Sequence, residues 1–256
     1  MVLERTQHGK IAVLSLNRPE AANSLNPELM KAITSTLREI EQDVNTQVVV
    51  LTGQGEKIFC AGMDLRGFAE SGSSAGAAAA ESDGPDSYKM AVGFKKPIIA
   101  AVNGAAVGGG FELALSCDMI VAADTARFGL PEVKRGLFAA GGGTMLGTMI
   151  PLPLAMEAAL TGDLYPADKV AEWGLVNKVV PFDQLIPAAI ELAEKIAANA
   201  PLGLSITKEL IRRSVEKDPT LGRATPEESA VVFSSEDAIE GATAFIEKRP
   251  PNWQGR

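Results

Sequence analysis

The sequence predicts an α/β fold, because short apolar strands alternate with helical segments along most of the chain. Residues 11–16 and 48–52 are β-branched runs bounded by Gly or Pro, which is typical of strands. Between them, Asn26 can cap a helix that has Pro27 at its first position. The apolar residues of this predicted helix recur at helical spacing on one face: Leu29, Ile33, Leu37 and Ile40.

The middle of the chain continues the alternation. Residues 97–103 form a second buried run that leads into the glycines 108–110, after which residues 111–117 indicate a helix and residues 119–122 another strand. Alternating strands and helices are typical of α/β proteins. Because the strands are continuously apolar, we expect sheets that are covered on both faces.

The pattern turns helical from residue 183 onward. Three helices are expected there, the last capped by Ser234 or Ser235. We therefore divide the chain into an α/β core, residues 1–195, and a C-terminal helical region, residues 196–256. Residues 70–85 form a low-complexity tract of small and acidic residues, which predicts a loop.

Composition excludes several classes of protein. The 256 residues are 46% hydrophobic and 22% charged, as in globular proteins, and the net charge of −8 argues against nucleic-acid binding through a basic face. No apolar segment predicts a signal peptide or a membrane span. Two cysteines, Cys60 and Cys117, are too few for a disulfide framework, so we expect a reduced, cytoplasmic protein.

Common catalytic motifs are absent or lack their context. Residues 72–76 match G-x-S-x-G, but the lone histidine, His8, lies far upstream, where a Ser-His-Asp hydrolase needs one late in the chain. The glycine clusters 108–110 and 141–143 contain neither a dinucleotide fingerprint nor a P-loop. No spacing of acidic residues specifies a metal, and we predict none.

Three segments combine glycines with acidic residues in apolar surroundings: 59–65, 103–113 and 128–132. A glycine run that opens a helix presents free N–H groups at the positive end of the helix dipole, where an oxyanion can bind. Glu112 and Glu132 in such surroundings suggest a carboxylate pair with displaced pKa values. From the residues alone, either glutamate could instead serve as a helix-start or salt-bridge residue.

These segments resemble the crotonase superfamily, most closely its enoyl-CoA hydratase branch. The resemblance begins at residues 16–25, continues through 96–104 and ends at 235–241, followed by Ala-Phe-Ile-Glu-Lys-Arg at residues 244–249. It implies a crotonase-like spiral of ββα units with a C-terminal helical region that builds trimers, often paired into hexamers. The expected partners are an acyl-CoA thioester and further copies of the chain.

The resemblance also assigns roles to residues. The backbone N–H groups of Met63 and Gly109 would form an oxyanion hole for the thioester carbonyl, and Glu112 and Glu132 would hold a water between them. CoA would enter as part of the substrate, so no separate cofactor is expected. The residues that would bind CoA or the substrate are Ala22, Ala61, Gly62, Asp64, Leu65, Arg66, Phe245 and Lys248.

The implied activity is the reversible syn hydration of a trans-2-enoyl-CoA to a 3-hydroxyacyl-CoA. The alternatives are an enoyl-CoA isomerase, a carnitinyl-CoA-type dehydratase, an acyl-CoA hydrolase and a non-catalytic acyl-CoA-binding paralogue. Two glutamates favour hydration over isomerisation, which needs one base. The chain departs from common hydratases at residues 138–140, where Phe-Ala-Ala replaces the usual Pro-Gly, and residues 253–256 are similar to the carnitinyl-CoA dehydratase branch.

Overall fold

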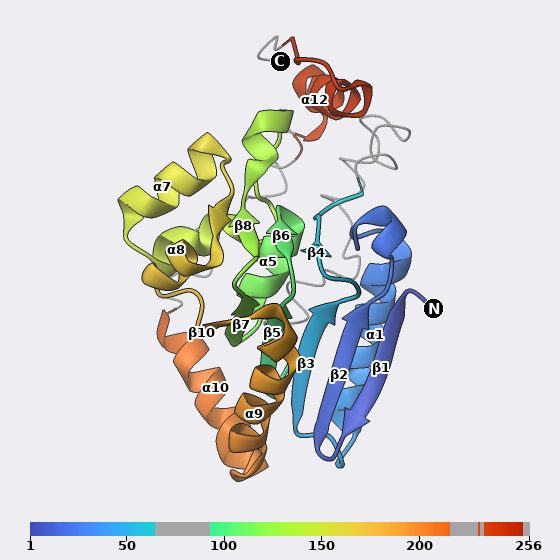
Figure 1. Ribbon diagram of the computed structural model, residues 1–256. Helices are drawn as coiled ribbons and strands as arrows, with labels where there is room; N and C mark the ends of the chain where they lie inside the picture. Colours follow the sequence, from blue (N-terminus) through green and yellow to red (C-terminus); the bar gives the residue numbers. More distant parts are fainter. Residues whose placement is uncertain (65–92, 216–229, 231–232, 253–256) are drawn as a thin grey trace.

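Two β-sheets and their surrounding helices make up the computed structural model, which describes residues 1–64, 93–215, 230 and 233–252 (Figure 1). The larger sheet has six strands in the order β1-β2-β3-β5-β7-β10. Its strands are β1 (Leu3–His8), β2 (Ile11–Leu16), β3 (Val48–Gly53), β5 (Ile98–Val102), β7 (Met119–Ala123) and β10 (Lys178–Val180). β1 pairs antiparallel to β2, and all the other neighbours are parallel.

The smaller sheet has four strands in the order β4-β6-β8-β9. They are β4 (Ile58–Cys60), β6 (Ala105–Val107), β8 (Arg127–Gly129) and β9 (Tyr165–Pro166). Three consecutive strand pairs share one arrangement: the first strand belongs to the larger sheet and the second to the smaller one. These pairs are β3–β4, β5–β6 and β7–β8. This repeated strand pair is the spiral that the resemblance implies, and the predicted α/β fold is confirmed.

Helices surround the sheets, and local chemistry explains where several of them begin. They are α1 (Pro27–Gln42), α5 (Gly109–Ser116), α6 (Leu146–Met149), α7 (Leu152–Thr161), α8 (Ala167–Glu172), α9 (Leu185–Ala197), α10 (Pro201–Val215) and α12 (Glu236–Glu247). Asn26 caps α1, because its side chain accepts a hydrogen bond from the Leu29 N–H at 2.9 Å. Ser235 caps α12 in the same way, accepting from the Ala238 N–H at 3.0 Å. Both caps were predicted.

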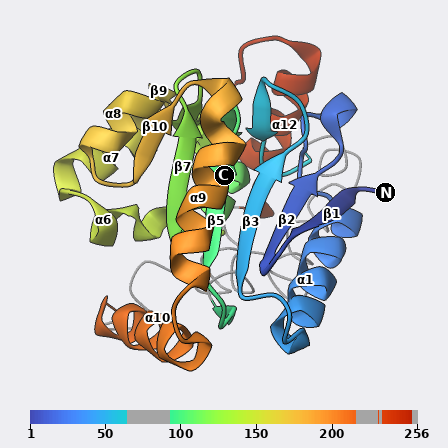
Figure 2. The ribbon, with the colours of Figure 1, turned by 60° about the horizontal axis from the view of Figure 1, so that its bottom comes forward.

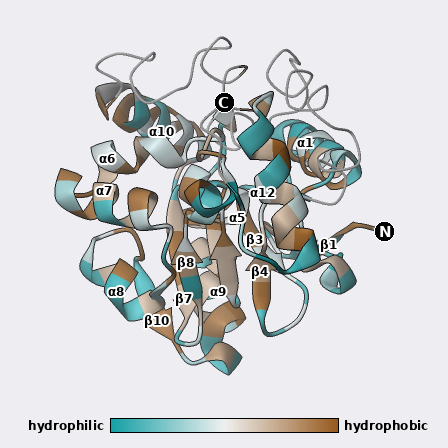
Figure 3. Cartoon of the chain, turned by 90° about the horizontal axis from the view of Figure 1, so that it is seen from above, coloured by the Kyte–Doolittle hydropathy of each residue, from teal (hydrophilic) through white to brown (hydrophobic). Residues whose placement is uncertain are grey.

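The larger sheet is the centre of the core. α9 lies along it and contacts β2, β3, β5 and β7 (Figure 2). Every residue of β3 and β5 is buried, which explains their continuously apolar sequences. β4, which is Ile-Phe-Cys, is hydrophobic, whereas the outward surface of α1 is largely hydrophilic (Figure 3).

The sequence prediction missed strands of two kinds. β1 exposes all its residues except Leu3, so it lacks an apolar run. β4, β6, β8 and β10 have three residues each and β9 has two, too few to show a period. Residue 195, where we divided the chain, lies in the last turn of α9, and the division itself remains a prediction. None of the described helices is long and apolar enough to cross a membrane.

Candidate active site

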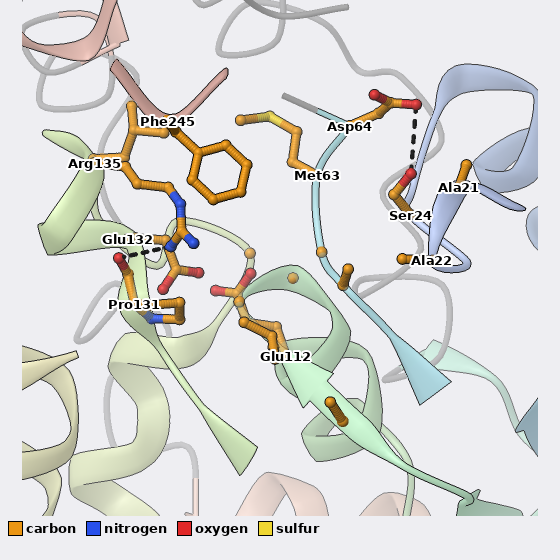
Figure 4. Close-up of a pocket in the computed structure, with 18 of the residues that line it drawn as sticks. Ala21, Ala22, Ser24, Met63, Asp64, Glu112, Pro131, Glu132, Arg135 and Phe245 are labelled. Atoms are coloured by element: carbon orange, nitrogen blue, oxygen red, sulfur yellow. Dashed lines mark hydrogen bonds between the residues drawn. The ribbon is translucent and has the colours of Figure 1, made fainter. Parts of the chain in front are cut away.

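A cavity of about 930 Å³ lies where the smaller sheet, the start of α5 and α12 meet (Figure 4). Its size is that of a small-molecule site. The lining residues come from residues 18–24, 58–64, 105–112, 131–141 and the C-terminal part of the chain. The three glycine-rich acidic segments, which spacing alone could not bring together, therefore meet at one place.

One wall of the cavity is a stretch of backbone around Met63. Leu25 donates its N–H to the Gly62 carbonyl at 2.7 Å, and its own carbonyl accepts from the Asp64 N–H at 3.1 Å. These two bonds form a parallel bridge around Met63, whose own N–H takes no part in it. The bridge thus fixes the Met63 N–H while leaving it available to a ligand.

The facing wall is the start of α5. Gly108 precedes the helix with φ +56°, and the N–H of Gly109 is among the first N–H groups of the helix, which have no partner inside it. Gly62 has φ +85°, and a Cβ there would lie 2.9 Å from the Gly109 nitrogen. Glycine at both positions therefore lets the two segments meet, and the N–H groups of Met63 and Gly109 lie on adjacent backbone.

Glu112 is buried in the first turn of α5, with 6% of its surface exposed. Its Oε1 accepts a hydrogen bond from the Gly143 N–H at 2.8 Å, which holds the carboxyl group in place. A Cβ at Gly141 would lie 2.7 Å from the other oxygen, Oε2. The second glycine cluster, residues 141–143, therefore makes room for this carboxylate.

Glu132 lies in the short 3-10 helix η2 (Pro131–Arg135). Burial raises the pKa of Glu132 to about 7, although a hydrogen bond to its own backbone and the charge of Arg135 oppose the shift. Within the described part of the chain, its buried Oε2 has no hydrogen-bond partner. Figure 4 shows the carboxyl groups of Glu132 and Glu112 turned toward one another inside the cavity.

Arg135 is a lining residue that the sequence did not single out. Its guanidinium carbon lies 4.5 Å from the ring centroid of Phe245, which belongs to α12. Its Nη1 donates to the Pro131 carbonyl at 3.1 Å. The sequence did contain one sign of its place in the site, because Arg135 follows Glu132 by three positions. One turn of 3-10 helix puts residues at this spacing on the same side of the helix.

The far end of the cavity is built around the loop 18–24. Ala22 has φ +54°, and its carbonyl accepts from the Ala61 N–H at 3.1 Å. The Arg18 guanidinium contacts Asp64 at 3.3 Å and donates to the Ser24 carbonyl at 2.6 Å. Arg18, Arg135 and Lys248 are the basic residues in the described lining of the cavity.

The structure brings together every predicted site residue that it describes. The lining includes Ala22, Ala61, Gly62, Met63, Asp64, Gly109, Glu112, Glu132, Phe245 and Lys248. The positions outside the described residues are Leu65, Arg66, the tract 70–85 and residues 253–256.

Comparison with known proteins agrees with this geometry. The profile of the enoyl-CoA hydratase/isomerase family matches residues 6–256, almost the whole chain. This chain belongs to that family. The resemblance to the crotonase superfamily is thereby confirmed.

The names of similar proteins specify different acyl groups, carnitinyl in some and short-chain enoyl in another. The chain is 39% identical to a carnitinyl-CoA dehydratase of Citrobacter koseri, over 99% of this chain and 98% of that one. It is also 39% identical to a short-chain-enoyl-CoA hydratase of Clostridium acetobutylicum, over 97% and 95%. The structure of a carnitinyl-CoA dehydratase from Mycobacterium avium superposes with a TM-score of 0.87 at 38% identity, covering 100% of this chain and 99% of that one.

Proposed function

We propose that this family member catalyses the reversible syn addition of water to a trans-2-enoyl-CoA, forming a 3-hydroxyacyl-CoA. The observation that supports it best is the convergence of the Glu112 and Glu132 carboxyl groups beside the N–H groups of Met63 and Gly109. Hydration needs these two kinds of group together. One kind moves protons to and from water and carbon, and the other stabilises the charge that develops on the thioester oxygen.

In this proposal the two N–H groups bind the thioester carbonyl oxygen. Polarising that carbonyl makes the β-carbon electrophilic and stabilises the enolate that forms when oxygen adds. Gly109 begins α5, so the helix dipole favours negative charge at this oxygen. Loss of one oxyanion donor typically costs about 3–4 kcal/mol of transition-state stabilisation.

The two glutamates divide the proton transfers. One carboxylate takes a proton from the water as its oxygen attacks the β-carbon, and the other carboxyl, protonated, delivers a proton to the α-carbon. Two carboxyl groups in one buried site do not both ionise easily, so we expect them to share a proton. The pKa of about 7 for Glu132 keeps a substantial protonated fraction at neutral pH.

Ala22, Arg18 and Lys248, which all line the cavity, receive the CoA part of the substrate. Lys248 supplies local positive charge on a chain whose net charge is −8, whereas Arg18 is paired with Asp64. The mechanism uses no separate cofactor, and we propose that the chain works as a trimer or a dimer of trimers. Phe245 and Lys248, which the resemblance assigns to CoA or substrate binding, line the cavity of their own chain.

The experiment that tests this function follows the absorbance of the conjugated enoyl thioester when the purified protein meets trans-2-enoyl-CoAs of increasing length. We expect loss of absorbance with formation of 3-hydroxyacyl-CoA, reduced about 10²- to 10⁴-fold by Glu132→Gln or Glu112→Gln. Release of free CoA would instead indicate a hydrolase. Binding without turnover of any substrate would indicate a non-catalytic paralogue.

A further inference from the structure

The cavity contains a fixed cation stacked on an aromatic ring. Arg135 lies over the ring of Phe245 at 4.5 Å, within the range of a cation–π contact. Figure 4 shows the two side chains side by side above Glu132. The other aromatic residues among the described lining, Phe138 and Phe233, pack against each other edge to face with centroids 5.6 Å apart.

Backbone packing holds this stack in place. A Cβ at Gly241 would lie 2.0 Å from the Arg135 carbonyl oxygen, so α12 rests directly on the backbone of Arg135. Phe245 follows Gly241 by four residues and therefore lies on the same face of α12. The hydrogen bond from Nη1 to the Pro131 carbonyl fixes the guanidinium from the other side.

The arrangement bears on which acyl group the cavity accepts. Proteins recognise quaternary ammonium groups chiefly through aromatic faces, and a carnitinyl group carries such an ammonium close to the carbons that react. Here Arg135 already occupies the face of Phe245 next to Glu132. A second cation nearby would also meet the charge of Arg135 directly.

We propose that Arg135 is a specificity-determining residue that makes the cavity accept uncharged acyl groups and reject cationic ones. The inference rests on the proposed hydration and deepens it by naming the substrate class. Two like charges about 8 Å apart at an effective dielectric constant of about 20 disfavour binding roughly thirtyfold. The acidic lining side chains Glu20, Glu112 and Glu132 offset part of this repulsion, and Asp64 is paired with Arg18, so we expect a preference of at least about tenfold.

The test compares two substrates of the same shape and different charge. One is carnitinyl-CoA, and the other is 3-hydroxy-5,5-dimethylhexanoyl-CoA, in which a carbon replaces the quaternary nitrogen. Both are assayed in the dehydration direction, with 3-hydroxybutyryl-CoA as the reference substrate. We expect kcat/KM for the uncharged compound to exceed that for carnitinyl-CoA at least tenfold.

Two variants assign the preference to the charge. Arg135→Met removes the cation but keeps an unbranched side chain, and it should reduce the preference to about threefold or less. Arg135→Lys keeps the charge and should retain it. The proposal is overturned if the wild type dehydrates both compounds equally, or if Arg135→Met, while still able to dehydrate 3-hydroxybutyryl-CoA at a measurable rate, leaves the ratio unchanged.

Failure of the proposed function would look different. In that case none of the three substrates, including 3-hydroxybutyryl-CoA, would be dehydrated. The dissociation constants of the two compounds, measured by calorimetry on wild type and Arg135→Met, would then still test the role of Arg135. Equal affinities in the wild type, or the same ratio in both proteins, would overturn it. Tenfold weaker binding of carnitinyl-CoA that is lost in Arg135→Met would support it. If Arg135→Met does not fold, Arg135→Gln, which also lacks the charge, takes its place in the comparison.

Discussion

Replacing Gly141 with alanine should displace one carboxyl group and little else. The new Cβ would lie 2.7 Å from Glu112 Oε2, so the carboxylate must move by about 0.7 Å to reach an ordinary contact beyond 3.4 Å. Gly141 does not have a left-handed φ, and alanine brings no backbone strain there. The atom in the way is the end of a side chain, so the fold can accommodate the change.

The displacement should affect activity far more than stability. It pulls Glu112 Oε1 away from the Gly143 N–H, now 2.8 Å distant, which fixes the carboxyl group. A misplacement near 1 Å in a catalytic constellation can cost about 10²-fold in rate. We therefore expect kcat/KM to fall about 100-fold, while the melting temperature drops by about 2–4 °C for each kcal/mol of stability lost.

A matched control separates this effect from a general effect of adding a methyl group. Gly147 lies six positions further on, in α6, and the nearest atom to a Cβ there is Leu152 Cδ1 at 3.6 Å. Gly147→Ala should keep wild-type kcat/KM for crotonyl-CoA. The reasoning is refuted if folded Gly141→Ala retains activity within about threefold of wild type, or if both variants lose activity equally.

Three further predictions concern stability and reactivity. The folded-state pKa of Glu132, about 7 against an ordinary 4.5, favours the protonated form, so stability falls as pH rises from 4.5 through 7. At pH 8 the free energy of unfolding of Glu132→Gln should therefore exceed that of the wild type by up to about 3 kcal/mol, and at pH 4 the two should be equal. Urea unfolding measures both values, and equal stability at both pH values would contradict this. Burial raises the pKa of Cys60 and Cys117 to about 12, so a thiol reagent should modify neither in the native protein; rapid modification would be inconsistent with these buried thiols. Gly241→Ala should destabilise the protein by about 1–3 kcal/mol, because the Arg135 backbone blocks the new methyl group; an unchanged melting temperature would contradict the close packing.

The elements that could be predicted from the sequence are those with a strong local signal. β2, β3, β5 and β7 are apolar runs, and the Asn26 cap marks the start of α1. β1 is the edge strand of the larger sheet, pairs only with β2 and buries only Leu3. It is a strand because of its hydrogen bonds to β2, and its sequence alone does not show this. Tertiary pairing decides such elements, and composition does not reveal it.

The candidate site divides in the same way. Glu112, Glu132 and the glycines beside them carried a recognisable pattern, because close backbone approach and buried carboxyl groups require those residues. Arg135 carried only its spacing of three positions after Glu132, and a basic residue in a short helix is ordinary until α12 folds over it. Its contact with Phe245 joins segments 110 residues apart, which only the tertiary structure brings together.

Two glutamates that together add water across the double bond of an enoyl-CoA are the core of the proposed mechanism. Its most direct test is incubation of crotonyl-CoA with the protein in D₂O, with the product analysed by NMR. We expect 3-hydroxybutyryl-CoA with one deuteron on the α-carbon, formed by syn addition and suppressed in both Glu112→Gln and Glu132→Gln. A deuterated enoyl-CoA isomer without the hydroxyl group, or hydration that persists in either variant, would contradict it.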